Sequence, residues 1–310
     1  YLVVSYKEPP GSDQQSISGK RIAVLQLGTH PVINEVVNGL NDRVKELYKD
    51  SVAIELYNAN FDFSALSMLA NQMVSSKPNV LVGVTTPAVG QLIGANRGSF
   101  PLVFTFVSDP RDIGYTGRGS KLNVTGLSDK VEYRKTLSLI RYVMPKARII
   151  GYIVTKSENN AITIHKKFSD IAPNYGFQIK TVTIDGAQDV PQASELLVKS
   201  VDLFLFGGDN TVMSAINVVI ATAKSRKLPV FSCDKESVQK GAVAAYSVPY
   251  REMGRRTADY CGLILSGAKP DCIPVEDFSG NKLVINLPAC NELGLTMPEI
   301  LLNNADLIIR

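Results

Sequence analysis

Short runs of β-branched and aromatic residues alternate along this chain with longer segments in which apolar residues recur every three or four positions. The runs predict strands, and the segments between them predict helices with one buried face. The pattern breaks off after residue 107 and begins again at residue 149, so the chain contains two consecutive arrays of strands and helices. The predicted strands are 21–27, 52–59, 80–84, 102–107, 149–155, 178–184, 201–207, 229–234 and 241–248.

The strand runs at 80–84 and 201–207 are apolar with hardly an interruption. Such strands are typical of parallel sheets with helices on both faces, because a strand with one face in water would alternate apolar and polar residues. We therefore expect an α/β protein with two doubly wound, parallel-sheet lobes. The length of 310 residues agrees with two lobes, at roughly 100 to 200 residues per domain.

Composition disfavours several classes of function. The 33 Lys and Arg residues are scattered among 29 Asp and Glu residues, so the net charge is only +4 and we expect no nucleic-acid partner. No apolar run reaches the roughly 18 residues of a membrane-spanning helix. With two histidines, four cysteines and no C-x-x-C pair, a metal site is not expected.

The motifs of nucleotide-dependent and hydrolytic enzymes are absent from the sequence. The first strand run leads into Gly28, Thr29, His30 and Pro31 instead of G-x-G-x-x-G, and neither G-x-x-x-x-G-K-[ST] nor G-x-S-x-G occurs. His30 could act as a base, but the sequence shows no nucleophile and no orienting carboxylate to accompany it. We therefore expect no cofactor and no enzymatic activity.

Small polar side chains gather where the predicted strands end. Ligands of parallel sheets bind beyond the carboxyl ends of the strands, where loops lead into helix N-termini. At any single position, capping of the following helix is an equal alternative, but capping does not explain the accumulation in both arrays. The candidate positions are Thr29, His30, Thr85, Thr86, Ser108, Asp109, Ser157, Asn160, Asp209, Asn210, Thr211 and Asp234.

Six segments carry a resemblance to a known family: VGVTTPAVGQL at 82–92, VFTFVSDP at 103–110, NVTGLSD at 123–129, GGDNTVMSAI at 207–216, PVFSCDKESVQKGAVAAYSV at 229–248 and YREMGRRTAD at 250–259. They resemble the extracytoplasmic substrate-binding proteins of ABC transporters, nearest to the branch with tryptophan- and phenylalanine-binding members. The resemblance covers about residues 20–298, and its most specific part is 207–259.

This resemblance implies a type I periplasmic binding-protein fold, in which three crossover segments join the lobes. A ligand that contacts both lobes then stabilises a closed form by its differential affinity. The crossings are expected near 126–130, 248–250 and 279–282. The expected lobe 1 comprises 1–127 and 249–279, and the expected lobe 2 comprises 128–248 and 280–310.

The resemblance also implies a receptor, not an enzyme, that delivers a small amino-acid-like solute to the permease of an ABC importer. Such a receptor would be a monomer in the periplasm or on the outer face of the cytoplasmic membrane. The polar, turn-rich opening after Tyr1 suits a tether left by processing, which leaves a lipid anchor open. A sugar or nucleoside carrier, which would need many hydroxyl partners and no ammonium site, and a ligand-sensing receptor domain remain alternatives.

Roles for several candidates follow from the same resemblance. Thr85 and Thr86 fall at a predicted helix N-terminus, which favours a ligand carboxylate. An ionised Asp on the facing lobe could hold a ligand ammonium, although a cap carboxylate is a nearly equal alternative for Asp234. The residues that line the facing lobe in similar proteins are Asp209, Asn210, Thr211 and Asp234.

Aromatic residues near the predicted cleft loops could contact an apolar part of the ligand. Phe106, Tyr246 and Tyr250 are the candidates, and a place in the core is the alternative for each. The sequence departs from the family at Cys233, where similar proteins often have a small hydroxyl residue or alanine.

Cys261 and Cys272 allow two interpretations. The turn residues Gly267 and Pro270 could fold the chain back and bring the two thiols within bonding distance. Alternatively both are free, because cysteine is also an ordinary small buried residue. Cys233 and Cys290 are expected in the core.

Overall fold

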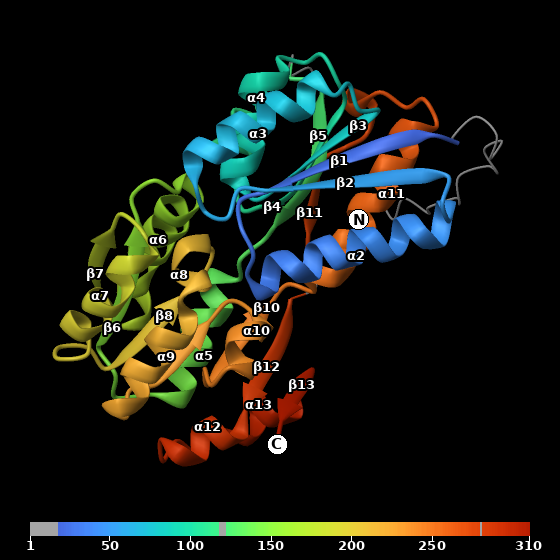
Figure 1. Ribbon diagram of the computed structural model, residues 1–310. Coiled ribbons are helices and arrows are strands. Elements are labelled where there is room, and N and C mark those ends of the chain that lie inside the picture. The colour runs from blue at the N-terminus through green and yellow to red at the C-terminus, as the bar shows by residue number, and fades with distance from the viewer. Residues whose placement is uncertain (1–17, 118–121, 280) are drawn as a thin grey trace.

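The computed structural model describes residues 18–117, 122–279 and 281–310. The predicted tether after Tyr1 lies outside these residues, as does position 280 of the third expected crossing. Figure 1 shows two α/β lobes, each built on its own sheet. The predicted fold class is therefore confirmed.

Lobe 1 contains a six-stranded parallel sheet in the order β11-β5-β4-β3-β1-β2. Its strands are β1 (Lys20–Gln26), β2 (Val52–Asn58), β3 (Val80–Val84), β4 (Leu102–Val107), β5 (Val124–Asp129) and β11 (Glu276–Phe278). Its helices are α2 (Pro31–Tyr48), α3 (Phe63–Ser75), α4 (Thr86–Asn96) and α11 (Tyr250–Leu265), with short 3-10 turns at Pro110–Ile113 and Pro270–Cys272.

Lobe 2 contains a seven-stranded sheet in the order β13-β12-β10-β9-β8-β6-β7. We expected a parallel sheet, but one pair of strands differs: β12 runs antiparallel to β10 after the chain returns from lobe 1. Its strands are β6 (Ile149–Thr155), β7 (Gln178–Ile184), β8 (Leu203–Phe206), β9 (Val230–Ser232), β10 (Ala244–Ser247), β12 (Lys282–Asn286) and β13 (Leu307–Ile309).

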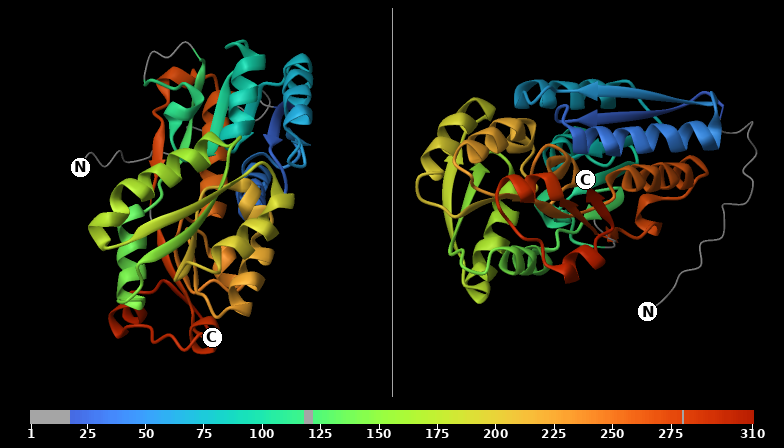
Figure 2. Two further views of the ribbon diagram at one scale, coloured as in Figure 1. Left: turned by 90° about the vertical axis from the view of Figure 1, so that its left-hand side faces the viewer. Right: turned by 90° about the horizontal axis from the view of Figure 1, so that it is seen from below.

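Helices cover the sheet of lobe 2, and the last two of them lie at the end of the lobe remote from lobe 1 (Figure 2). The helices are α5 (Tyr133–Val143), α6 (Asn159–Ile171), α7 (Val190–Leu197), α8 (Asn210–Ser214), α9 (Ile216–Ser225), α10 (Lys235–Gln239), α12 (Leu287–Glu292) and α13 (Glu299–Asn303), with 3-10 turns at Ala172–Tyr175 and Ala187–Asp189.

The chain passes between the two sheets after β5, after β10 and after β11. Strand β5 stays paired in the lobe 1 sheet as far as Asp129. After β10 the chain enters α11, which packs on α2 and β4 of lobe 1. Each lobe therefore takes segments from both halves of the chain.

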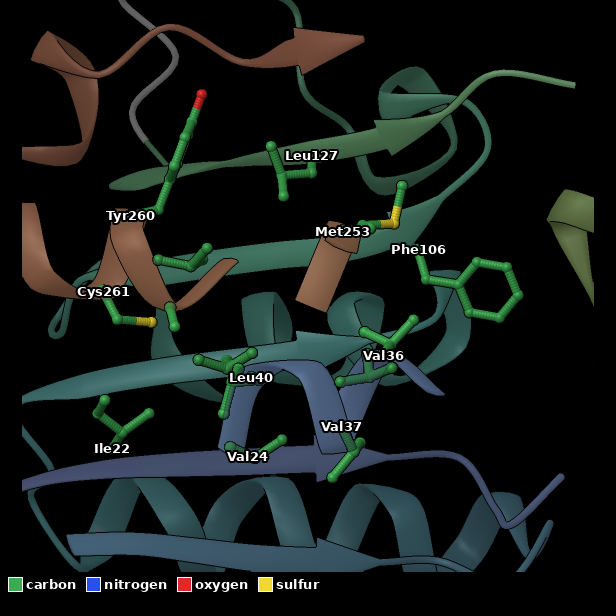
Figure 3. Packing of buried hydrophobic residues seen from close by; sticks show 14 of the residues in the cluster. Ile22, Val24, Val36, Val37, Leu40, Phe106, Leu127, Met253, Tyr260 and Cys261 are labelled. Atoms are coloured by element: carbon green, nitrogen blue, oxygen red, sulfur yellow. The ribbon is translucent and has the colours of Figure 1, made fainter. Parts of the chain in front are cut away.

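Helices α2 and α11 cross at contact distance of their backbones. A Cβ atom at Gly39 would overlap the carbonyl oxygen of Arg251, and one at Gly254 would overlap that of Val36. The two glycines therefore permit an approach that no larger residue would allow. Around this crossing, apolar residues of both helices pack with β1 and β5, and Phe106 lies at the edge of the cluster (Figure 3).

All four cysteines are in the described part of the chain, and all are free. The disulfide that we left open between Cys261 and Cys272 is not formed, because Cys261 is buried in the lobe 1 core while Cys272 is exposed in a 3-10 turn. Cys233 and Cys290 are buried.

Candidate functional site

A small cavity lies between the lobes, beyond the carboxyl ends of their strands. The lobes meet so closely that the space between these side chains has room for about one water molecule. The lobe 1 side and its crossover segments contribute His30, Val32, Phe106, Asp129, Val131 and Tyr250. Lobe 2 contributes Gly208, Asp209, Asn210, Met213, Cys233 and Asp234.

Direct contacts join the lobes around this cavity. Lys167 Nζ of α6 lies 3.0 Å from Asp109 Oδ2, and Thr163 Oγ1 of the same helix donates a hydrogen bond of 3.1 Å to Asp112 Oδ1. Met213 of α8 packs into the apolar cluster of lobe 1. The structure therefore shows the lobes closed on each other.

His30 links the lobes at the wall of the cavity. Its Nδ1 accepts a hydrogen bond from the Ile33 backbone N–H at 3.4 Å, which caps α2, so Nε2 carries the proton and donates to Asn210 Oδ1 at 3.3 Å. Burial lowers the pKa of His30 to about 4, which keeps the imidazole neutral near pH 7. His30 is thus a neutral donor in the interface between the lobes.

Phe106 and Tyr250 form the aromatic part of the lining. Their rings meet edge to face with centroids 5.1 Å apart, and the His30 ring lies 6.3 Å from Phe106. Phe106 has a φ of 56°, at the irregularity where β4 shifts register against β5. A positive φ is costly for a residue of this size, and such strain is often found at binding sites.

Asp209 lines the cavity with its carboxylate held by lobe 2. It accepts hydrogen bonds from the Thr155 backbone N–H at 2.7 Å, from Thr155 Oγ1 at 2.9 Å and from the Val212 backbone N–H at 3.0 Å. Burial, and next the negative charge of Glu158, raise the pKa of Asp209 to about 7. The hydrogen bonds of Asp209 therefore join the start of α8 to the end of β6.

Glu158 is a completely buried carboxylate that the sequence analysis missed. It accepts hydrogen bonds from the backbone N–H groups of Asn210 and Thr211 at 3.1 and 2.8 Å, and from their side chains at 2.6 and 2.7 Å. Because these partners lie 52 and 53 residues away, no local motif could have revealed the role.

Asp234 caps α10, as the alternative interpretation of this residue anticipated. Its Oδ1 accepts from the Ser237 backbone N–H at 2.7 Å, and its Oδ2 accepts from the hydroxyl groups of Ser232 and Ser237. Burial raises the pKa of Asp234, and these hydrogen bonds oppose the shift. Both of its oxygens are therefore occupied within lobe 2.

Asp129, at the end of β5, is a lining residue that the sequence analysis did not single out. It is 1% exposed, and neither of its oxygens has a hydrogen-bond partner in the described part of the chain. Burial raises its pKa to about 7, and the Ser108 hydroxyl opposes the shift from nearby without the geometry of a hydrogen bond. Asp129 is thus a buried carboxylate at the cavity that no described residue satisfies by a hydrogen bond.

Thr85 and Thr86 lie at the same edge of the lobe 1 sheet, between β3 and α4, but they do not line the cavity. Both are buried, and neither hydroxyl has a hydrogen-bond partner within the described residues. Thr85 has a φ of 87°, which is a strained value for a β-branched residue. Their side chains do not cap α4, so capping does not account for them.

The structure brings six of the predicted residues to the cavity: His30, Phe106, Asp209, Asn210, Asp234 and Tyr250. Among the others, Tyr246 is partly buried and packs against the lobe 2 core, with Lys135 Nζ 5.9 Å from its ring centroid, and Thr29 Oγ1 accepts a hydrogen bond from Asn58 Nδ2. Predicted residues outside the lining are Thr29, Thr85, Thr86, Ser108, Asp109, Ser157, Asn160, Thr211 and Tyr246.

The described residues contain no group of three His, Cys, Asp or Glu side chains that could hold a metal ion. Among the helices of the same residues, none combines the length and the apolar character needed to cross a membrane.

Comparison with protein families shows that residues 21–309 match the family described as ABC transporter substrate binding protein. A curated relative is the "Tyrosine-binding protein" of Clostridioides difficile (strain R20291). It is 28% identical over 272 residues, which cover 86% of this chain and 79% of the relative.

Two solved structures overlay on nearly the whole chain with a TM-score of 0.90 each. A conserved domain protein from Vibrio cholerae is 32% identical, with 93% of this chain and 99% of that chain covered. An ABC domain in complex with L-Trp from Streptococcus pneumonia is 29% identical, with coverage of 94% and 100%.

A third structure is the ligand-free, open form of a substrate-binding protein with adhesive properties from Clostridium difficile. It is 26% identical and covers 94% of this chain and 99% of its own, but its TM-score is 0.68. The lobes of the present structure are therefore arranged more as in the L-Trp complex than as in this open form.

Proposed function

Because the chain belongs to the ABC transporter substrate-binding protein family, we propose that it receives a small, amino-acid-like solute with an aromatic side chain in the cleft between its lobes. It hands this solute to the membrane permease of an ABC importer. The observation that carries the proposal is the interlobe cavity, which combines buried carboxylates with the aromatic pair Phe106 and Tyr250.

The charge of the lining supports a ligand with a positive group. Asp129, Asp209 and Asp234 line the cavity, whereas no Lys or Arg is among the described lining residues. His30 is neutral near pH 7 and adds no positive charge. An ammonium group is the complement of such a lining, since buried charges need a partner of opposite sign.

Thr85 and Thr86 are the proposed contacts of the ligand carboxylate. Their hydroxyl groups have no hydrogen-bond partner in the part of the chain that the structure describes, and they lie at the N-terminus of α4, where backbone N–H groups favour an anion. Reaching them from the cavity requires the lobes to part and close again around the ligand. Hinge motion of this kind is the usual way in which two lobes enclose a solute.

The aromatic character of the ligand is supported by the relatives. The Clostridioides difficile relative is named for tyrosine binding, and the Streptococcus pneumonia structure holds L-Trp. A sugar carrier is less well supported, because solved structures with bound allitol or D-arabinose are 17% and 12% identical and show the fold alone.

In this proposal the receptor works outside the cytoplasmic membrane as a monomer, with or without a lipid anchor, and releases its ligand chemically unchanged. Family membership supports the location and the partnership with a permease. A receptor with this role has no need of a nucleophile beside His30, and the hydrogen bonds of His30 are with Asn210 and Ile33.

A thermal-shift screen of the purified protein tests the proposal. L-tyrosine, L-tryptophan and L-phenylalanine are compared with galactose, ribose and uridine. A ligand at a hundred times its dissociation constant stabilises a protein by about 2.7 kcal/mol, so binding of an aromatic amino acid raises the unfolding temperature clearly. Stabilisation by sugars or uridine alone would contradict the proposal, as would chemical conversion of the bound ligand.

A further inference from the structure

The three carboxylates that line the cavity are not equivalent. Asp209 and Asp234 each accept hydrogen bonds on both oxygens from groups of lobe 2. Asp129 is equally buried, yet neither of its oxygens has a partner in the described part of the chain. A carboxylate removed from water without compensation is costly, so this arrangement requires an explanation.

Among the described residues, no basic side chain donates a hydrogen bond to Asp129. Lys167 contributes to the electrostatics of Asp129, but its Nζ is paired with Asp109 Oδ2 at 3.0 Å. Asp109 is also bound by Arg111, with Nη2 to Oδ2 at 2.6 Å. The positive charges at this edge of the cleft are therefore engaged with Asp109, and Asp129 is left facing the cavity.

The position of Asp129 suits a contact that couples binding to closure. It is the last residue of β5, from which the chain leaves lobe 1 for lobe 2. The cavity around it also includes Tyr250, the first residue of α11 after the second crossing, and Asp234 on lobe 2. A group bound to Asp129 is thus close to two of the segments about which the lobes move.

We propose that Asp129 receives the ammonium group of the ligand, while Asp209 and Asp234 serve to fix the helix N-termini of lobe 2. This inference rests on the proposed function and adds the class of ligand that the site requires, an aromatic compound with a free primary amine. It reassigns the ammonium contact that the sequence analysis placed on Asp209 or Asp234.

Calorimetry with matched ligand pairs tests the assignment. Each aromatic amino acid that binds the wild type is compared with the same acid lacking the amine: 3-(4-hydroxyphenyl)propanoate for tyrosine, 3-indolepropanoate for tryptophan and 3-phenylpropanoate for phenylalanine. We expect the wild type to prefer the amine-bearing member by at least tenfold, because a hydrogen bond to a charged group contributes about 1.5 to 3 kcal/mol.

Asp129→Asn is expected to weaken binding of the amino acid by about ten- to a hundredfold and to reduce the preference for the amine to within about threefold. Asp234→Asn is the matched control, since it neutralises a second lining carboxylate but leaves an oxygen to cap α10. This control should keep the preference of the wild type. Asp129→Ser serves as a second variant if Asp129→Asn does not fold.

The outcomes distinguish a failure of the proposed function from a failure of the assignment of the ammonium contact to Asp129. If the wild type binds none of the three amino acids, the proposed function fails. If it binds one of them and the Asp129 variants keep the preference for the amine, the function stands and the assignment to Asp129 is overturned. Loss of the preference in Asp234→Asn alone would return the ammonium contact to Asp234.

Discussion

The two faces of the cleft carry similar residues but use them differently. On lobe 2, Asp209, Glu158 and Asp234 accept hydrogen bonds from groups of the same lobe. On lobe 1, the side-chain oxygens of Thr85, Thr86 and Asp129 are buried without partners among the described residues, whereas on lobe 2 the Asn160 Oδ1 is the exception among the predicted positions. We therefore expect a polar residue at a strand end to contact the ligand when its own lobe leaves it unsatisfied, and to serve the scaffold when its own lobe satisfies it.

The largest effect is expected from Glu158, because four N–H and O–H groups of Asn210 and Thr211 converge on it. Glu158→Ala leaves these donors unpaired and should lower the free energy of unfolding by about 3 kcal/mol or more. Urea denaturation measures the change. Glu158→Gln, which keeps one acceptor oxygen, should lose less, and equal losses in both variants would contradict a scaffold role for the network.

A second prediction concerns the pH dependence that Asp129 confers. Its pKa is raised to about 7 in the folded protein, mainly by burial, so the folded state binds more protons than the unfolded state between about pH 4 and 7. Stability supplied by the protonated form is thus lost as the pH rises through this window. The free energy of unfolding of Asp129→Asn relative to wild type should increase by about 2 kcal/mol between pH 5 and 7.5. If the difference in unfolding free energy between Asp129→Asn and wild type did not change with pH in the ligand-free protein, Asp129 would not be a buried carboxylate with a raised pKa.

Asp234→Ala should lower the stability of the protein more than it changes the preference for one ligand over another. The substitution removes the cap of α10 and leaves the Ser237 backbone N–H without its acceptor, at a cost of about 1 to 2 kcal/mol. Thermal unfolding measures this loss, with Asp234→Asn as the variant that keeps a cap. If Asp234→Ala left the unfolding temperature unchanged but lost ligand affinity, Asp234 would be a ligand contact and not a structural cap.

The smallest effect is expected at Thr86, whose hydroxyl has no hydrogen-bond partner among residues 18–117, 122–279 and 281–310. Thr86→Ala should leave stability nearly unchanged but weaken binding of an aromatic amino acid by about fivefold, which corresponds to about 1 kcal/mol. The backbone N–H groups at the start of α4 remain to face the ligand carboxylate. Calorimetry on Thr86→Ala and Thr86→Ser decides, since only the serine variant should retain the affinity of the wild type.

Much of the fold was predictable because long apolar strands have a clear signature. The predicted strands at 80–84, 102–107, 149–155 and 178–184 coincide with β3, β4, β6 and β7. Strand β5 was missed, since its sequence VTGLSD is short, polar at its end and interrupted by Gly126. Strands β11 and β13 have three residues each and only partly buried side chains, so they show no pattern of their own.

The site was predictable only in part, for a related reason. The rule that ligands collect at strand ends found His30, Asp209, Asn210 and Asp234, which line the cavity. It could not find Asp129, because β5 was not recognised as a strand. Tyr246 was placed near the cleft by proximity in sequence, but its partly buried side chain packs against the lobe 2 core.

A crystal structure of the protein with a bound aromatic amino acid tests the central claim most directly. The account predicts closed lobes, the ligand ammonium nitrogen within about 2.7 to 3.2 Å of an Asp129 oxygen, and the hydrogen bonds of Asp209 and Asp234 unchanged from those described here. An ammonium group held by Asp234 or Asp209, with Asp129 turned away from the ligand, would contradict it.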